Sequence, residues 1–418
     1  MTDFPALERR LGTPDAVVIG LGSMIGAGVF TAFAPAAQAA GAGLLIGLAV
    51  AAVVAYCNAT SSAQLAAAYP TSGGTYTYGR ERLGPWPGFI AGWGFVVGKT
   101  ASCAAMALTF AAYAVPSAWQ RPVAIVAVVA LAAVNYRGIT RTAALARVLV
   151  AVVLLVLALA VGASVGGGQA EVSGLSGWTA PTGGVLGILQ AAGLLFFAFA
   201  GYARIATLGE EVRDPQRTIP RAILIALGTT VLVYAVVAGS VLLVLGADGV
   251  AATNAPLAEA VSAGSWDWAG PVVRFGAAAA SLGALLALIA GIGRTTLAMA
   301  RHDDLPRWLS AVHPRFGVPH RAEVALAVVV CVLIAAVDLR AAIGFSSFGV
   351  LIYYLIANLS AFTQPRADRR FPRALQIVGA LGCGVLVVTL PTTTVLTGLA
   401  VFAVGLGYRL VRLRLSPS

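Results

Sequence analysis

Residues 22–28 read Gly-Ser-Met-Ile-Gly-Ala-Gly and lie inside an apolar block that runs from residue 15 to residue 38. Each glycine within a helix costs about 1 kcal/mol relative to alanine, so three of them weaken the helix near mid-membrane. A second interruption, Ala198-Phe199-Ala200-Gly201-Tyr202, falls in the block 185–208. Either segment alone could be explained by glycine that lets another helix pack closely. A pair of interrupted segments at corresponding positions of two halves is typical of secondary transporters.

The composition places these blocks in a membrane. The chain has 418 residues, of which 59% are hydrophobic and 10% charged. Soluble domains carry about 25% charged residues. The apolar residues gather in blocks of about 20, the length that spans a ~30 Å hydrocarbon core as a helix, without strand-like alternation. We therefore expect an all-α integral membrane protein with about twelve transmembrane helices, at 15–38, 41–66, 88–115, 121–136, 143–165, 185–208, 221–246, 270–299, 322–338, 341–362, 373–389 and 391–411.

The basic residues predict the orientation. Connections on the side of the N-terminus hold most arginines, and the opposite connections hold mainly acidic residues, namely Glu171, Asp248, Glu259 and Asp267. Short loops rich in Lys and Arg face the cytoplasm. We expect a multi-pass protein of the cytoplasmic membrane with both termini in the cytoplasm. Topology explains the net charge of +11, so no nucleic-acid partner is expected, and the four cysteines lie in apolar blocks without metal-site spacing, so no metal or cofactor is expected.

The two interruptions also predict a binding site. An unwound turn frees C=O groups at the end of one half-helix and N–H groups at the start of the next. In hydrocarbon such groups must be satisfied by a ligand or by water. The free N–H groups suit a carboxylate and the free carbonyls suit an ammonium. We therefore expect both breaks to face one shared cavity, which holds a small solute such as a zwitterionic α-amino acid.

Four stretches resemble the amino acid–polyamine–organocation superfamily. They are Gly22–Phe30 (GSMIGAGVF), Pro70–Trp93, Phe196–Pro220 and Ala298–Pro319. The resemblance implies a five-plus-five inverted-repeat transporter fold in which helices 1 and 6 are discontinuous. It divides the chain into a cytoplasmic N-terminus, two repeats, two further helices and a cytoplasmic C-terminus, at 1–14, 15–165, 185–362, 373–411 and 412–418.

The resemblance also implies the site residues. The family's carboxylate site falls on the backbone N–H groups around Ala27 and Gly28. Its ammonium site falls on carbonyls near Ser23, Met24, Phe197 and Ala200. Phe199 and Tyr202 match aromatic residues of the pocket and its gate, although ordinary packing is the alternative for both. The predicted substrate-binding set is Ser23, Met24, Ile25, Gly26, Ala27, Gly28, Phe197, Phe199, Ala200, Gly201 and Tyr202.

Lys99 is the sole lysine of the chain and lies in the third apolar block. A position about eleven residues into a helix is roughly 17 Å deep. A charge there costs at least ~2.5–3.5 kcal/mol unless it is paired, hydrated or neutral. We expect Lys99 to face the interior of the bundle and to act in coupling or on an anionic substrate group. The alternative is a wet crevice with a structural partner. Some relatives carry a lysine on helix five, but the matching position here is Val153.

Four further residues are candidates for coupling or gating. Arg204 follows the second break, and Ser281 in the eighth block could contact sodium or Lys99. A serine bonded back to its own helix is the alternative for Ser281. Glu210 and Glu211 could form an inner gate with Arg204 or Arg294, or could simply be solvated.

These observations predict an alternating-access secondary transporter of an amino acid or closely related small metabolite. We expect a neutral substrate and coupling to protons, with sodium as an alternative ion. The second interpretation is a carrier or exchanger of amines, polyamines or cationic amino acids. The third is a membrane receptor that senses amino acids. An enzyme is not expected, because the three histidines lie in one connection. The sequence does not predict the oligomeric state.

Overall fold

The computed structural model describes residues 11–70, 73–138, 143–177, 181–209 and 211–415. Within these ranges the chain is a bundle of helices without a named β-strand, apart from an isolated bridge between Leu11 and Val212. The all-α membrane fold predicted from the sequence is therefore confirmed.

Each predicted apolar block corresponds to helical structure. Ten helical stretches of the described residues are long and apolar enough to cross a bilayer, and α16 is apolar but shorter. The helices that match the blocks are α1 (Thr13–Met24) with α2 (Gly28–Thr31) and α3 (Phe33–Ala40), α4 (Leu44–Ala68), α6 (Pro85–Ala114), α7 (Gln120–Tyr136), α8 (Ala143–Gly166), α9 (Gly184–Phe199) with α10 (Ala203–Ala206), α11 (Pro215–Ala252), α13 (Gly270–Arg301), α14 (His320–Ala336), α15 (Leu339–Phe362), α16 (Arg373–Thr389) and α17 (Thr392–Leu415).

The connections contain helices that the apolar pattern did not predict. Helix α5 (Gly74–Leu83) lies between α4 and α6, and α12 (Pro256–Ser262) lies between α11 and α13. Helix α5 is held by its aromatic residues, because Tyr76 and Tyr78 are fully buried. Short connecting helices of this kind are fixed by tertiary packing, since isolated helices of such length are marginal in water.

The transmembrane helices pack in reciprocal pairs. Helix α1 packs on α11 and α9 packs on α4, while α6 packs on α15 and α13 packs on α8. If the first five and the next five helices exchanged places, each pair would map onto its counterpart, as an inverted repeat requires. The repeat boundaries at 15–165 and 185–362 stay a prediction.

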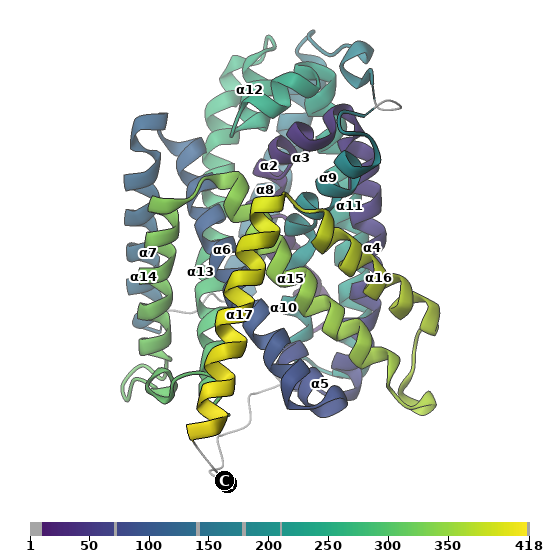
Figure 1. Cartoon of the computed structure of the whole chain (residues 1–418). Coiled ribbons are helices and arrows are strands. Elements are labelled where there is room, and N and C mark those ends of the chain that lie inside the picture. The colour runs from purple at the N-terminus through teal and green to yellow at the C-terminus, as the bar shows by residue number, and fades with distance from the viewer. Residues whose placement is uncertain (1–10, 71–72, 139–142, 178–180, 210, 416–418) are drawn as a thin grey trace.

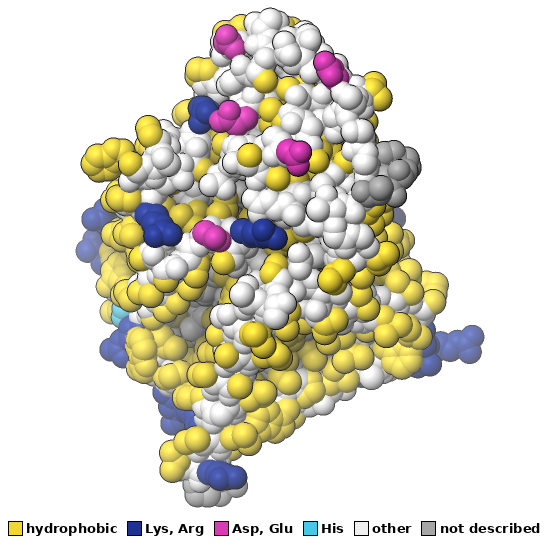
Figure 2. Space-filling view, turned by 45° about the horizontal axis from the view of Figure 1, so that its top comes forward, with side chains coloured by type: hydrophobic (Ala, Val, Ile, Leu, Met, Phe, Trp, Pro, Cys, Tyr) yellow, Lys and Arg dark blue, Asp and Glu magenta, His cyan; other side chains and the backbone are white. Residues whose placement is uncertain are grey.

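The two ends of the bundle, which lie at the bottom and the top of Figure 1, carry different charged residues. Helix α5 and the last residues of α17 lie at the lower end in Figure 1, which we call the arginine-rich end because it includes Arg80, Arg82, Arg409 and Arg412. Helix α12 lies at the upper end, which we call the acidic end. Figure 2 turns the upper end forward and shows magenta acidic side chains gathered on it. This distribution fits the predicted orientation, in which the arginine-rich end faces the cytoplasm.

Buried polar side chains join helices across the bundle. The Asn358 amide of α15 donates to Asn58 Oδ1 of α4 at 2.6 Å, and the Ser61 hydroxyl donates to Asn358 Oδ1 at 2.7 Å. The Ser102 and Ser346 hydroxyls are hydrogen-bonded at 2.6 Å between α6 and α15. In a bilayer, packing and interhelical hydrogen bonds hold helices together because lipid removes the hydrophobic driving force between them.

Candidate functional site

The first helix is broken at residues 25–27. Helix α1 ends at Met24, three residues are non-helical, and α2 begins at Gly28. The break is shorter than the predicted 22–28, because the Ile25 N–H still donates to Leu21 O at 2.7 Å and keeps Gly22 and Ser23 helical. No side chain caps the start of α2. N–H groups at this point therefore lack partners within the helix.

The second break is a tightened turn and is not fully unwound. Helix α9 ends at Phe199, residues Ala200–Tyr202 form a 3₁₀ turn, and α10 resumes at Ala203. A 3₁₀ stretch inside a helix shifts the hydrogen-bond register and often marks a functional hinge. The prediction that helices 1 and 6 are discontinuous is confirmed, although Ala198 and Phe199, which were part of the predicted interruption, lie within α9.

The two breaks are in direct contact. A Cβ atom added to Gly201 would lie 2.3 Å from the Ser23 carbonyl oxygen and 2.6 Å from the Met24 nitrogen. A Cβ atom added to Gly28 would lie 2.7 Å from the Ala198 Cα. Because backbone atoms cannot move aside as a flexible side chain can, only glycine allows this approach. The breaks therefore meet in one place, as the sequence predicted.

Tyr234 of α11 bridges the two breaks. Its hydroxyl oxygen lies 2.5 Å from Met24 O at the end of α1 and 3.0 Å from Ala198 O near the end of α9. The single hydroxyl proton is donated toward these two carbonyls. Tyr234 is fully buried and its ring packs against Phe199, with 5.1 Å between ring centroids.

Lys99 of α6 reaches the second break. Its ammonium donates to Ala200 O at 3.2 Å, and the Tyr354 hydroxyl of α15 donates to the same oxygen at 3.3 Å. The Lys99 side chain is buried, with 7% of the residue exposed. The expectation that Lys99 faces the interior of the bundle is confirmed. Its role in coupling or substrate binding stays a prediction.

A cavity extends from the breaks toward the arginine-rich end. This cavity, which we call the vestibule, has a volume of about 300 Å³. Ser23, Ala200 and Gly201 line its inner part, and Gly73 and the last turns of α13 line its outer part. The basic residues that line it are Lys99, Arg204, Arg294 and Arg301.

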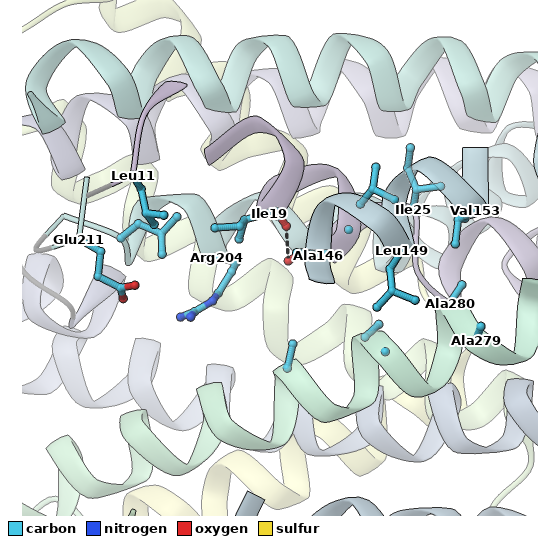
Figure 3. A pocket seen from close by; sticks show the side chains of 17 residues that line it. Leu11, Ile19, Ile25, Ala146, Leu149, Val153, Arg204, Glu211, Ala279 and Ala280 are labelled. Atoms are coloured by element: carbon cyan, nitrogen blue, oxygen red, sulfur yellow. Dashed lines mark hydrogen bonds between the residues drawn. The ribbon is translucent and has the colours of Figure 1, made fainter. Parts of the chain in front are cut away.

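A second cavity of about 170 Å³ adjoins the vestibule and shares Ser23 and Arg204 with it. Figure 3 shows that its two ends differ in polarity. Arg204 and Glu211 lie at one end, and Ile25, Leu149 and Val153 lie at the other. The Arg204 guanidinium donates to the Thr207 hydroxyl at 3.2 Å.

The side of the breaks that faces the acidic end is closed by aromatic residues. The Tyr113 hydroxyl donates to Phe30 O at 2.7 Å, and the two rings meet edge to face, 5.7 Å apart. Phe33 packs on Tyr234 in the same manner. These rings and that of Phe199 are fully buried. The site is thus open toward the arginine-rich end and shut toward the acidic end.

The predicted site residues fall into two groups. Those that line the vestibule or the adjoining cavity are Ser23, Ile25, Lys99, Ala200, Gly201, Arg204 and Glu211. Those that are buried behind the cavity walls are Met24, Gly26, Ala27, Gly28, Phe197, Phe199 and Tyr202. Tyr202 packs against Tyr354, with 4.9 Å between ring centroids. Their roles as substrate contacts stay predictions.

The remaining charged and polar candidates are not brought into contact with one another. Ser281 is buried on α13, lines neither cavity, and its hydroxyl has no hydrogen-bond partner among the described residues. Among the described residues no ion pair joins Glu211 to Arg204 or Arg294. Glu210 lies outside the described residues. The inner gate therefore stays a prediction.

The sequence reasoning missed two residues of the site. Tyr234 and Tyr354 bind the carbonyls of the breaks, whereas Arg294, which lines the vestibule, was already named as a possible gate partner. The available signal was a polar or charged group within an otherwise apolar helix. Such groups in membrane segments usually face the bundle interior and mark functional sites.

Comparison with known proteins agrees with the geometry. The family model described as amino acid permease matches residues 11–408, nearly the whole described chain. The chain belongs to the amino acid permease family. It is therefore a multi-pass membrane protein of a family of transporters, within the superfamily that the sequence resembled.

Three relatives show the range of this similarity. An uncharacterized transporter of Mycobacterium tuberculosis is 62% identical over 404 residues, which cover 96% of this chain and 91% of the relative. The branched-chain amino acid permease BcaP of Bacillus subtilis is 25% identical over 96% of this chain and 92% of its own. The chloroplastic cationic amino acid transporter 7 of Arabidopsis thaliana is 28% identical over 85% of this chain and 65% of its own.

Proposed function

We propose that this permease is a secondary active transporter that carries an amino acid or a closely related small carboxylate across the cytoplasmic membrane by alternating access. One observation carries the proposal. Two broken helices touch at Gly201 and Ser23, and a cavity leads from that contact toward the arginine-rich end. Transporters of this architecture bind substrate near mid-membrane at discontinuous helices.

The mechanism follows from the two sides of the breaks. In the present conformation solute enters or leaves through the vestibule, which we assign to the cytoplasmic side because of the arginine-rich loops. The substrate carboxylate would bind N–H groups of the first break, around Ala27 and Gly28. Transport then requires the vestibule to close and the aromatic contacts of Tyr113, Phe30 and Phe199 to open.

A cationic substrate is the second candidate. The names of the plant relatives favour it, since they are described as cationic amino acid transporters. The vestibule opposes it, because the charged side chains that line it are basic. Competition between neutral, acidic and basic amino acids for one transport activity separates these candidates.

The test is counterflow in proteoliposomes. Vesicles that contain the purified protein are preloaded with one unlabelled amino acid at a time, and uptake of the labelled compound is followed. We expect saturable counterflow for at least one member of the panel, none in protein-free liposomes, and no unitary conductance in planar bilayers. An imposed proton or sodium gradient identifies the coupling ion. Binding without flux would contradict the proposal and would indicate a receptor.

A further inference from the structure

The carbonyl acceptors of the second break are already occupied by donors of the chain itself. A carbonyl oxygen has two lone pairs. Ala200 O accepts one hydrogen bond from Lys99 and one from Tyr354. Ala198 O and Met24 O both lie within hydrogen-bond distance of the Tyr234 hydroxyl. A substrate ammonium placed at Ala200 O would have to displace the Lys99 ammonium, which already supplies a positive charge there.

The charged side chains that line the vestibule also disfavour a substrate ammonium. Its lining includes Lys99, Arg204 and Arg294, and no aspartate or glutamate among the described residues. Glu211 lines the adjoining cavity, at the end that it shares with Arg204. Arginine stays protonated in proteins, so Arg204 and Arg294 carry positive charge on the vestibule whatever the protonation state of Lys99. A narrow cleft lined by one sign of charge concentrates ions of the opposite sign.

Lys99 also has donors to spare. An ammonium carries three N–H donors, and a single hydrogen bond, to Ala200 O, accounts for one of them within the described part of the chain. The cost of burying a charge falls when a counter-charge is close. A negatively charged solute in the vestibule would supply that counter-charge, whereas a cationic solute would raise the cost.

From this geometry we propose that the transported solute is a small carboxylate with a net negative charge, such as a 2-oxo dicarboxylate or an acidic amino acid whose own ammonium lies away from Ala200 O, and that Lys99 binds its anionic group. This inference rests on the proposed transport function and replaces the neutral substrate expected from the sequence. Lys99 takes the place that a substrate ammonium would otherwise occupy. Arg204 supports it with a fixed positive charge on the same cavity.

The experiment compares acids with their nearly isosteric amides. Counterflow and thermal stabilisation are measured with L-glutamate against L-glutamine, L-aspartate against L-asparagine, and with 2-oxoglutarate and L-lysine. We expect each preferred acid to be favoured over its amide by about tenfold, because hydrogen bonds to charged groups are the stronger ones. L-Lysine is expected neither to bind nor to compete.

Two variants of Lys99 test whether this side chain causes the preference for acid over amide. Lys99→Gln keeps an N–H donor near Ala200 O but removes the charge, so the preference for acid over amide should fall, whereas Lys99→Arg should retain it. Arg414→Gln is the matched control, because it removes one exposed arginine of α17 that lines neither cavity. If Lys99→Gln does not fold, the comparison of acids with amides in the wild-type protein and in Lys99→Arg still decides whether the substrate is anionic.

Two results would overturn the inference. One is transport of an amide or of L-lysine by the wild-type protein at least as well as of the acids. The other is an unchanged preference for acid in Lys99→Gln. In either case transport itself is observed, so the proposed function stands. Absence of counterflow with every member of a wider amino acid panel would instead contradict the proposed function, and this inference with it.

Discussion

The Tyr234 hydroxyl contacts the carbonyl ends of both broken helices. Met24 O and Ala198 O belong to segments far apart in sequence, and both lie within 3.0 Å of this oxygen. A buried carbonyl that loses its donor in a dry interior keeps its desolvation penalty. The relative position of α1 and α9 near the site therefore depends on this hydroxyl.

We predict that Tyr234→Phe lowers both stability and transport. The change removes the donor but keeps the ring, and leaving buried acceptors unsatisfied costs about 1–3 kcal/mol. Thermal unfolding in detergent and counterflow in proteoliposomes measure the two effects. Tyr56→Phe is the matched control, because Tyr56 is 45% exposed on α4. Equal melting temperatures for the two variants would show that Tyr234 is not a structural bridge.

At the scale of residues, charge was easier to predict than hydrogen bonding. The cost of burying an ammonium in lipid is sufficient to predict that Lys99 faces the inside of the bundle. The sequence analysis assigned the Ala200 carbonyl to a substrate ammonium, and it did not predict that the Lys99 ammonium binds this oxygen, because their approach depends on how α6 packs on the second break. Tyr234 was missed for a related reason. Its partners lie 210 and 36 residues away and are set by helix packing.

At the scale of elements, the two breaks were visible in the sequence because glycine acts on the backbone of its own segment. The residues at which each break begins and ends could not be predicted. The first break is confined to 25–27 and the second is a 3₁₀ turn, since local hydrogen bonds persist wherever packing allows. Helix α5 was missed because the connection 67–87 has no apolar run, and its burial through Tyr76 and Tyr78 is tertiary.

The contact between the breaks gives a prediction for Gly201. In Gly201→Ala the added methyl group would lie 2.3 Å from the Ser23 carbonyl oxygen, so the two helices must separate. Overpacking of this kind costs typically about 1–3 kcal/mol, and we expect transport to fall more steeply than stability because the substrate site itself is displaced. Counterflow rates and melting temperatures check this.

The control for Gly201→Ala is Gly228→Ala in α11, where nothing lies within 4 Å of the added Cβ atom. Alanine is the better helix former by about 1 kcal/mol, so this control should be neutral or slightly stabilising. Normal transport by Gly201→Ala would mean that the breaks tolerate separation and that their contact is not required for function.

At the scale of the whole molecule, one buried carboxylate joins segments of the arginine-rich end. Asp304 accepts hydrogen bonds from Arg80 and Tyr76 of α5, at 2.9 and 2.8 Å, and from Arg409 of α17, at 2.5 Å. Burial raises the pKa of Tyr76, and the hydrogen bond to Asp304 raises it further, so the phenol stays protonated and donates. The connection after α13 is thereby fixed to α5, which precedes α6, and to the last helix.

We predict that Asp304→Asn lowers the melting temperature strongly and that Asp303→Asn lowers it only slightly. The side chains of Asp304 and Arg409 are 4% and 7% exposed, and removing one charge of a buried pair costs about 3–5 kcal/mol because the other charge stays buried. Asp303 makes ion pairs with Arg307 and Arg412, but its side chain is 43% exposed and solvent screens it. Asp303 has a φ of 61°, a conformation that asparagine also adopts readily, so the control adds no backbone strain. Thermal unfolding of both variants at neutral pH makes the comparison. If Asp304→Asn lowers the melting temperature no more than Asp303→Asn does, the packing of α5 and α17 holds this end together without the buried charge.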